Sequence, residues 1–249
     1  MNKIRSALVA AAAGLAVAGV AQAAPTVSIG FANGVLHNAS AIAGTEVSSA
    51  AMAGMAVTMC FFGSSPCETA TWGGLAGGAS GTGWLFEGPL TDSFIDPFRI
   101  TVTGRFLQSF TLYGLGALTV FDTLLDADLA LGLPATLSSS PGSGNGRPFT
   151  VQSGAEGIDT LSVRYFDKVF VAGTDFNDLY LGMQVNFNML NSVSGYSGQF
   201  RFVADTDRVA PNGTLIPTAP PGPNPVPEPG TLALVALSLG LLAARRRRS

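Results

Sequence analysis

The sequence predicts an all-β body, an antiparallel β-sandwich or jelly roll, between an N-terminal signal peptide and a single short C-terminal transmembrane helix. The strongest observation is residues 179–189, where apolar and polar side chains alternate as in a strand with one buried face. Several other short β-rich runs are separated by Gly, Asn, Asp and Ser, which is typical of antiparallel folds. At each end of the chain an uncharged apolar segment lies next to basic residues.

The segment 1–23 has the three parts of a secretory signal peptide. A short basic start is followed by an uncharged apolar run over 7–20, which is shorter than the roughly 20 residues that span a bilayer. The small residues around the expected cleavage point are Ala21, Ala23 and Ala24. We therefore expect the export machinery and signal peptidase to act here, with an uncleaved anchor as the alternative.

The exported domain is expected over 24–216, and its apolar runs read as strands separated by turns. The expected strands are 26–31, 56–62, 98–103, 108–113, 117–121, 160–166, 168–172, 179–189 and 199–204. The segment 39–55 is rich in Ala, Gly and Ser and is compatible with a short helix or a loop. A loop is expected over 138–147, where Ser, Gly and Pro dominate.

The body is acidic, and its composition excludes several classes of function. Between the two terminal segments, seven Lys and Arg face 15 Asp and Glu, a net charge of −8, and Lys168 is the one lysine. No basic patch is visible, so nucleic acid is not an expected partner. One His and two Cys in the whole chain also exclude most zinc sites with several protein ligands.

Few residues of the body suggest catalysis. In an exported chain, Cys60 and Cys67 are expected to form a disulfide that closes a short loop. His37 would have to be the base of any Ser-His-Asp triad, yet no G-x-S-x-G elbow accompanies it. We therefore expect no catalytic residues. A secreted hydrolase that uses only carboxylates stays as an alternative.

A group of oxygen-bearing side chains precedes the strongest strand. Asp175, Asn177 and Asp178 place three oxygen ligands within one turn, which suits Ca²⁺. The alternative is turn formation, since Asp and Asn side chains bond nearby backbone N–H groups. The segment resembles a D-[FY]-N-D-L pattern of exported bacterial β-domains. Further carboxylates that could converge on the same edge are Asp122, Asp126, Asp128, Asp205 and Asp207.

The C-terminal region combines a stiff spacer, an apolar segment and a basic end. Seven prolines between 217 and 229 favour an extended polyproline conformation, so 217–225 is expected to be a spacer. The uncharged segment 231–244 would reach about 21 Å as a helix, short of a hydrocarbon core of about 30 Å. The expected stop-transfer residues are Arg245, Arg246, Arg247 and Arg248.

These features together resemble the PEP-CTERM sorting signal over 226–249. The residues that carry the resemblance, beside the apolar segment and the arginines, are Val226, Pro227, Glu228 and Pro229. The resemblance implies recognition by exosortase, a multi-pass membrane cysteine transpeptidase, and removal of the tail near Pro-Glu-Pro. It also implies a Gram-negative host that makes exopolysaccharide.

The leading hypothesis is a non-enzymatic protein of the cell surface or exopolysaccharide matrix, first anchored in the inner membrane by its C-terminal helix. The leading hypothesis requires no cofactor. The alternative is a calcium-dependent carbohydrate-binding β-sandwich, whose partner would again be exopolysaccharide and whose cofactor would be calcium. Its candidate sugar-stacking side chains are Trp72, Trp84, Phe86 and Tyr180.

Overall fold

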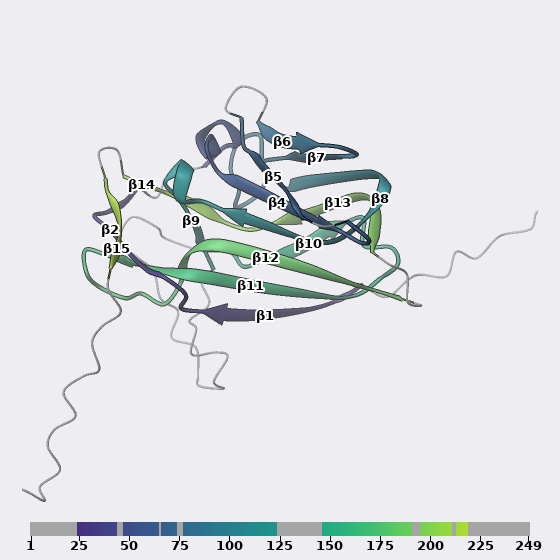
Figure 1. The fold of residues 1–249 in the computed structure, drawn as a ribbon. Coiled ribbons are helices and arrows are strands. Elements are labelled where there is room, and N and C mark those ends of the chain that lie inside the picture. The colour runs from purple at the N-terminus through teal and green to yellow at the C-terminus, as the bar shows by residue number, and fades with distance from the viewer. Residues whose placement is uncertain are drawn as a thin grey trace, which may run out of the picture.

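The computed structural model describes residues 24–43, 47–64, 66–73, 77–123, 146–190, 195–210 and 213–218. The expected signal peptide and the sorting region at 226–249 lie outside these residues. Within them the fold is all-β, as the sequence predicts, with 15 strands and two short 3₁₀ helices (Figure 1).

The strands follow one another along the chain with short connections. In the first half they are β1 (Thr26–Ala32), β2 (Leu36–Ala39), β3 (Ile42–Ala43), β4 (Ala56–Phe61), β5 (Glu68–Thr71), β6 (Gly78–Gly81), β7 (Trp84–Glu87), β8 (Phe98–Tyr113) and β9 (Thr119–Asp122). In the second half they are β10 (Thr150–Ser153), β11 (Ile158–Val171), β12 (Leu179–Met189), β13 (Tyr196–Val203), β14 (Thr206–Val209) and β15 (Leu215–Thr218). The 3₁₀ helices are η1 (Ser49–Met52) and η2 (Leu115–Ala117).

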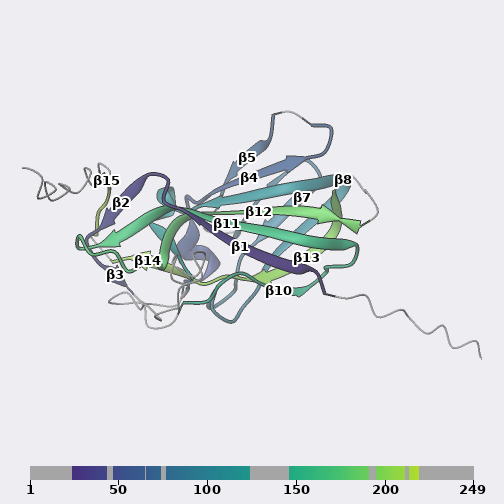
Figure 2. The same ribbon diagram turned by 90° about the horizontal axis from the view of Figure 1, so that it is seen from below.

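The described strands form one connected hydrogen-bonded network rather than two separate sheets. Its main path runs β10-β13-β8-β12-β11-β2-β15, and the other strands pair beside this path. The pairs are antiparallel, as expected, except that β1 and β2 both run parallel to β11. Figures 1 and 2 show β1, β11 and β12 side by side along one face of the body.

The network curls because its longest strand changes partners half-way. The first part of β8 pairs with β7 and β13, whereas its last part pairs with β4 and β12. Between these parts Gly104 has a φ of 69°, a left-handed value that favours glycine and bends the strand. The expected strands 98–103 and 108–113 are therefore one bent strand.

A core rich in aromatic side chains fills the space that the curled network encloses. Phe98 and Phe202 stack with ring centroids 5.1 Å apart, and Phe110 stacks on Phe202 at 5.4 Å. All three side chains are fully buried. Such pairs add about 0.5–1.5 kcal/mol each beyond the burial of apolar area, so this cluster ties β8 to β13.

One open question about boundaries is resolved, and one expectation needs correction. The segment 39–55, expected to hold a short helix or a loop, holds the short 3₁₀ helix η1 together with the end of β2 and the strand β3. Pro217 belongs to β15 and pairs with His37, so the folded body extends to residue 218 and the spacer begins later than 217. Proline is tolerated in β15 because this strand has β2 as its one partner in the described network. Of the expected loop 138–147, only 146 and 147 are described.

Candidate functional site

The predicted calcium ligands form a turn in which a lysine supplies the positive charge. The Lys168 Nζ lies 2.7 Å from Asp175 Oδ2 and also donates a hydrogen bond to Asn177 Oδ1. The backbone N–H of Asn177 donates to Asp175 Oδ1 at 2.9 Å, and Asn177 has a φ of 64°. This is the local bonding expected of Asp and Asn in tight turns, and it favours the turn interpretation over calcium binding.

The third predicted ligand, Asp178, has a different environment. Asp175 is 37% exposed at its side chain, whereas Asp178 is completely buried. The Asp178 carbonyl oxygen accepts hydrogen bonds from the backbone N–H of Thr123 at 3.0 Å and from its hydroxyl at 3.1 Å. Asp178 therefore fixes the start of β12 against the end of β9.

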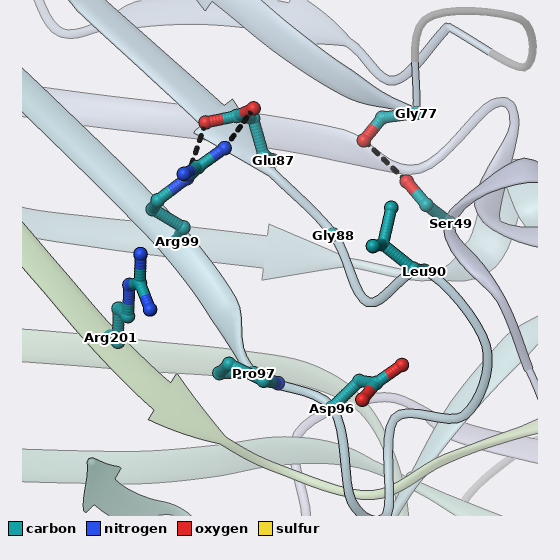
Figure 3. Close-up of a pocket in the computed structure, with 9 residues that line it drawn as sticks. All are labelled: Ser49, Gly77, Glu87, Gly88, Leu90, Asp96, Pro97, Arg99 and Arg201. Carbon is teal, nitrogen blue, oxygen red and sulfur yellow. Dashed lines mark hydrogen bonds and ion pairs between the residues drawn. The ribbon is translucent and has the colours of Figure 1, made fainter.

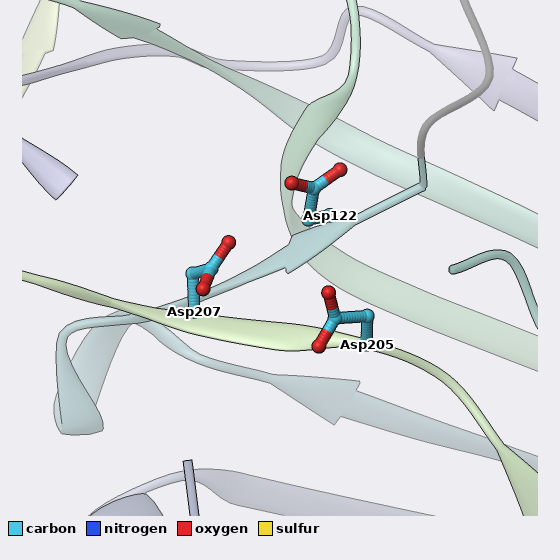
Figure 4. A group of neighbouring side chains, drawn as sticks. All are labelled: Asp122, Asp205 and Asp207. Carbon is cyan, nitrogen blue, oxygen red and sulfur yellow. The ribbon is translucent and has the colours of Figure 1, made fainter. Parts of the chain in front are cut away.

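Three other carboxylates from the predicted set do converge. Asp122, Asp205 and Asp207 each contribute a carboxylate oxygen to a group in which these atoms lie within 4.8 Å of one another (Figure 4). The fold brings them together because β9 and β14 pair antiparallel, and the N–H of Asp122 donates to the carbonyl of Asp205 at 3.2 Å. Asp205 and Asp207 are two residues apart, so they project on the same side. Asp126 and Asp128 lie outside the described residues.

These carboxylates are interior groups and not solvated loop residues. Asp122, Asp205 and Asp207 are 1%, 7% and 6% exposed. Burial first, and then the charges of Asp207 and Asp122, raise the pKa of Asp205 to about 8. The Ser93 hydroxyl, 3.3 Å from Asp205 Oδ1, acts in the opposite sense. The cluster therefore holds a proton on Asp205 at neutral pH, or requires a cation in its place.

The four aromatic side chains proposed as sugar-stacking platforms are all in the interior, and this prediction is wrong. Trp72, Trp84, Phe86 and Tyr180 are between 0% and 4% exposed. The Trp72 Nε1 donates to the carbonyl of Ser49 at 3.0 Å, so its polar edge is satisfied inside the protein. None of the four can stack on a ligand in solvent.

His37 is buried between strands. It lies on β2, opposite Val169 of β11 and Pro217 of β15, and is 2% exposed. Burial lowers its pKa, and the nearby charge of Asp167 only partly opposes this effect. Neither ring nitrogen has a hydrogen-bond partner among the described residues, so nothing there orients the imidazole as a general base.

The expected disulfide is present and closes a hairpin. Cys60, on β4, is bonded to Cys67, just before β5, with their Cα atoms 4.4 Å apart. The adjacent Glu68 accepts hydrogen bonds from Trp84 Nε1 at 2.8 Å and from the Arg105 guanidinium. The disulfide and this polar contact fix β4 and β5 beside β7 and β8.

The sorting region is defined by comparison with known families. The family model of the PEP-CTERM protein-sorting motif matches residues 225–248. No curated protein and no solved structure matches the chain significantly. None of the helices in the described ranges is long and apolar enough to cross a membrane, and the expected helix at 231–244 lies outside those ranges.

The fold and the matched tail together define an all-β protein with a C-terminal sorting signal. More specifically, the tail carries a PEP-CTERM protein-sorting motif, which implies an exported, membrane-anchored precursor that exosortase recognises and that is sorted to the cell surface.

Proposed function

We propose that this protein is a non-enzymatic component of the cell surface or of the exopolysaccharide matrix, delivered there by exosortase processing. The observation that carries the proposal is the PEP-CTERM motif at 225–248, which lies C-terminal to an all-β body whose last described strand ends at Thr218. In this proposal the body is the exported domain, and the tail is the signal that directs it to the cell surface.

The chemistry of the body supports a role without catalysis. His37 is the one histidine of the chain, and it is buried with a lowered pKa between β11 and β15. The carboxylates with perturbed environments, Asp122, Asp205 and Asp207, are at most 7% exposed, which leaves no room for a sugar ring beside them. These findings do not favour the alternative of a secreted hydrolase.

The calcium-dependent carbohydrate-binding alternative is weakened at both of its proposed elements. The ammonium of Lys168 already neutralises Asp175, and the aromatic platforms lie in the core. Any sugar contact of this body must therefore use surface groups other than those aromatic residues.

Each part of the tail has a separate physical task in the proposed sorting. The apolar segment 231–244 partitions into the bilayer by the hydrophobic effect. The terminal arginines resist translocation, because moving each charge through hydrocarbon costs at least about 2.5 kcal/mol. From their sequence we expect the prolines to favour an extended segment around Glu228, which an enzyme can bind without first ordering a flexible chain.

The test replaces the motif and follows the protein through cell fractions. Changing Pro227, Glu228 and Pro229 to Ala should leave the precursor exported and membrane-inserted but unprocessed. The matched control changes three spacer prolines outside the matched motif, at 220, 221 and 223, to Ala, and should still be processed. Normal processing of the motif variant would refute exosortase recognition of this segment.

A further inference from the structure

A small charged pocket lies on the face of the network that points away from the core. It has a volume of about 290 Å³, and Figure 3 shows Glu87, Arg99 and Arg201 on one side of it and Asp96 on another. The neighbouring side chains Phe98 and Phe202 point into the core, so the charged side chains point outward by the alternation of a strand.

The register of three strands places these charges in one row. Glu87 of β7 lies opposite Arg99 of β8, and Arg99 lies opposite Arg201 of β13. The row therefore contains two guanidinium groups, on β8 and β13, and one carboxylate, on β7. Arg99 and Arg201 are like charges directly opposite each other in an antiparallel pair, an arrangement that destabilises a sheet.

The Glu87 carboxylate is paired with one of the two arginines. Arg99 Nε donates to Glu87 Oε2 at 2.7 Å, and Arg99 Nη2 donates to Glu87 Oε1 at 2.5 Å. This is the bidentate geometry in which Arg and a carboxylate bind most strongly. Among the residues that the structure describes, Arg201 forms no ion pair with a carboxylate. The positive charge of its guanidinium therefore lies beside the pocket without a carboxylate partner among those residues.

The opposite side of the pocket presents hydrogen-bond acceptors and an apolar side chain. Asp96 Oδ2 accepts from the N–H of Thr91 at 3.0 Å and from its hydroxyl at 2.5 Å, and these bonds lower the pKa of Asp96. An ionised carboxylate retains further lone pairs for hydroxyl donors. Leu90 adds an apolar surface that is 88% exposed.

We propose that this pocket binds a carboxylate-bearing sugar unit, with the Arg201 guanidinium on the sugar carboxylate and with Asp96 accepting from its hydroxyl groups. This inference rests on the proposed function, because it names what the surface protein would bind. The volume is at the lower end of small-molecule sites and suits a single sugar ring.

The pocket is lined by both acidic and basic side chains, and the acidic ones disfavour anions that carry several negative charges. Glu87 and Asp96 would repel a phosphate-rich chain, whereas a single carboxylate can reach Arg201 while hydroxyls donate to the acidic groups. The pocket should therefore prefer an acidic sugar both to a neutral sugar and to inorganic phosphate.

The test is calorimetric titration of the exported protein, purified from the surface fraction, with sodium D-glucuronate. Glucose is the matched ligand control, since it has a hydroxymethyl group in place of the carboxylate. We expect saturable binding of glucuronate and none of glucose or phosphate. Arg201→Gln should weaken the affinity about 10-fold or more, because it removes a charge-assisted hydrogen bond. The control Arg164→Gln removes an exposed arginine of β11 outside the pocket and should not change the affinity.

Two further measurements separate the possible outcomes. A hexuronate oligomer that binds more tightly than the monosaccharide would identify a polysaccharide as the source of the ligand. Absence of saturable glucuronate and oligomer binding, or equal affinity of the Arg201→Gln variant, would overturn the inference. Either failure leaves the sorting test unaffected, because that test follows the tail and not the body.

Discussion

Replacing Asp205 by Asn should stabilise the protein at neutral and alkaline pH. Asn removes the ionisable group from the cluster with Asp122 and Asp207, and its amide oxygen can still accept the hydrogen bond from Ser93. The wild-type carboxyl group is 7% exposed and has a pKa raised from 3.8 to about 8, first by burial and then by its acidic neighbours.

The magnitude follows from the linkage between proton binding and folding. The folded state holds the Asp205 proton more tightly than the unfolded state. Its contribution to stability is therefore complete below pH 3.8 and is lost as the pH rises through about 8. One pKa unit corresponds to about 1.4 kcal/mol, so up to about 4 kcal/mol is lost between pH 4 and pH 7.

The assay is urea unfolding of the exported protein at a series of pH values. As the pH rises, the unfolding free energy of Asp205→Asn should increase relative to that of wild type. The exposed Asp159→Asn variant is the matched control and should follow the wild-type curve. Parallel curves for wild type and Asp205→Asn would refute the buried, proton-holding cluster.

Three other perturbations have defined outcomes. Changing both Cys60 and Cys67 to Ser should lower the unfolding free energy by about 2–3 kcal/mol in urea, since it opens a short closed loop; unchanged stability would contradict this. His37 has a lowered folded-state pKa, so its contribution to stability is present above pH 6.5 and is lost as the pH falls below it. His37→Gln should remove that part of the acid sensitivity in melting experiments, and an identical acid profile would argue against a buried neutral imidazole. Calcium should shift the melting temperature of wild type and Asp175→Asn equally, because Lys168 already neutralises Asp175; a shift confined to wild type would restore the calcium interpretation of the turn.

The sequence predicts those strands whose own pattern is strong. The alternation over Leu179–Met189 gives β12 with its observed bounds, although both faces are buried over its first five residues and burial alternates only in its second half. β8 was expected as two strands because Gly104 interrupts the apolar pattern, although the chain continues through it as a bend. Short strands such as β6, with the sequence GASG, carry no recognisable pattern, and their pairing with β7 decides their conformation.

The candidate sites depend on pairings that a single sequence does not reveal. Asp205 and Asp207 can be named as possible partners of Asp122, but their burial follows from the contact of β14 with β9. The row that contains Arg99 and Arg201 likewise exists because β13 is in register with β8, 102 positions apart at these two residues. By contrast, the sorting motif is local in the sequence and is recognised without the fold.

The intact mass of wild-type protein from the surface fraction shows directly whether exosortase removes the tail. We expect a chain that begins at Ala24 and ends near the Pro-Glu-Pro segment, without the apolar segment 231–244 and the terminal arginines. A surface protein whose mass still includes Arg248 and Ser249 would show that the tail is a permanent anchor and would contradict exosortase processing.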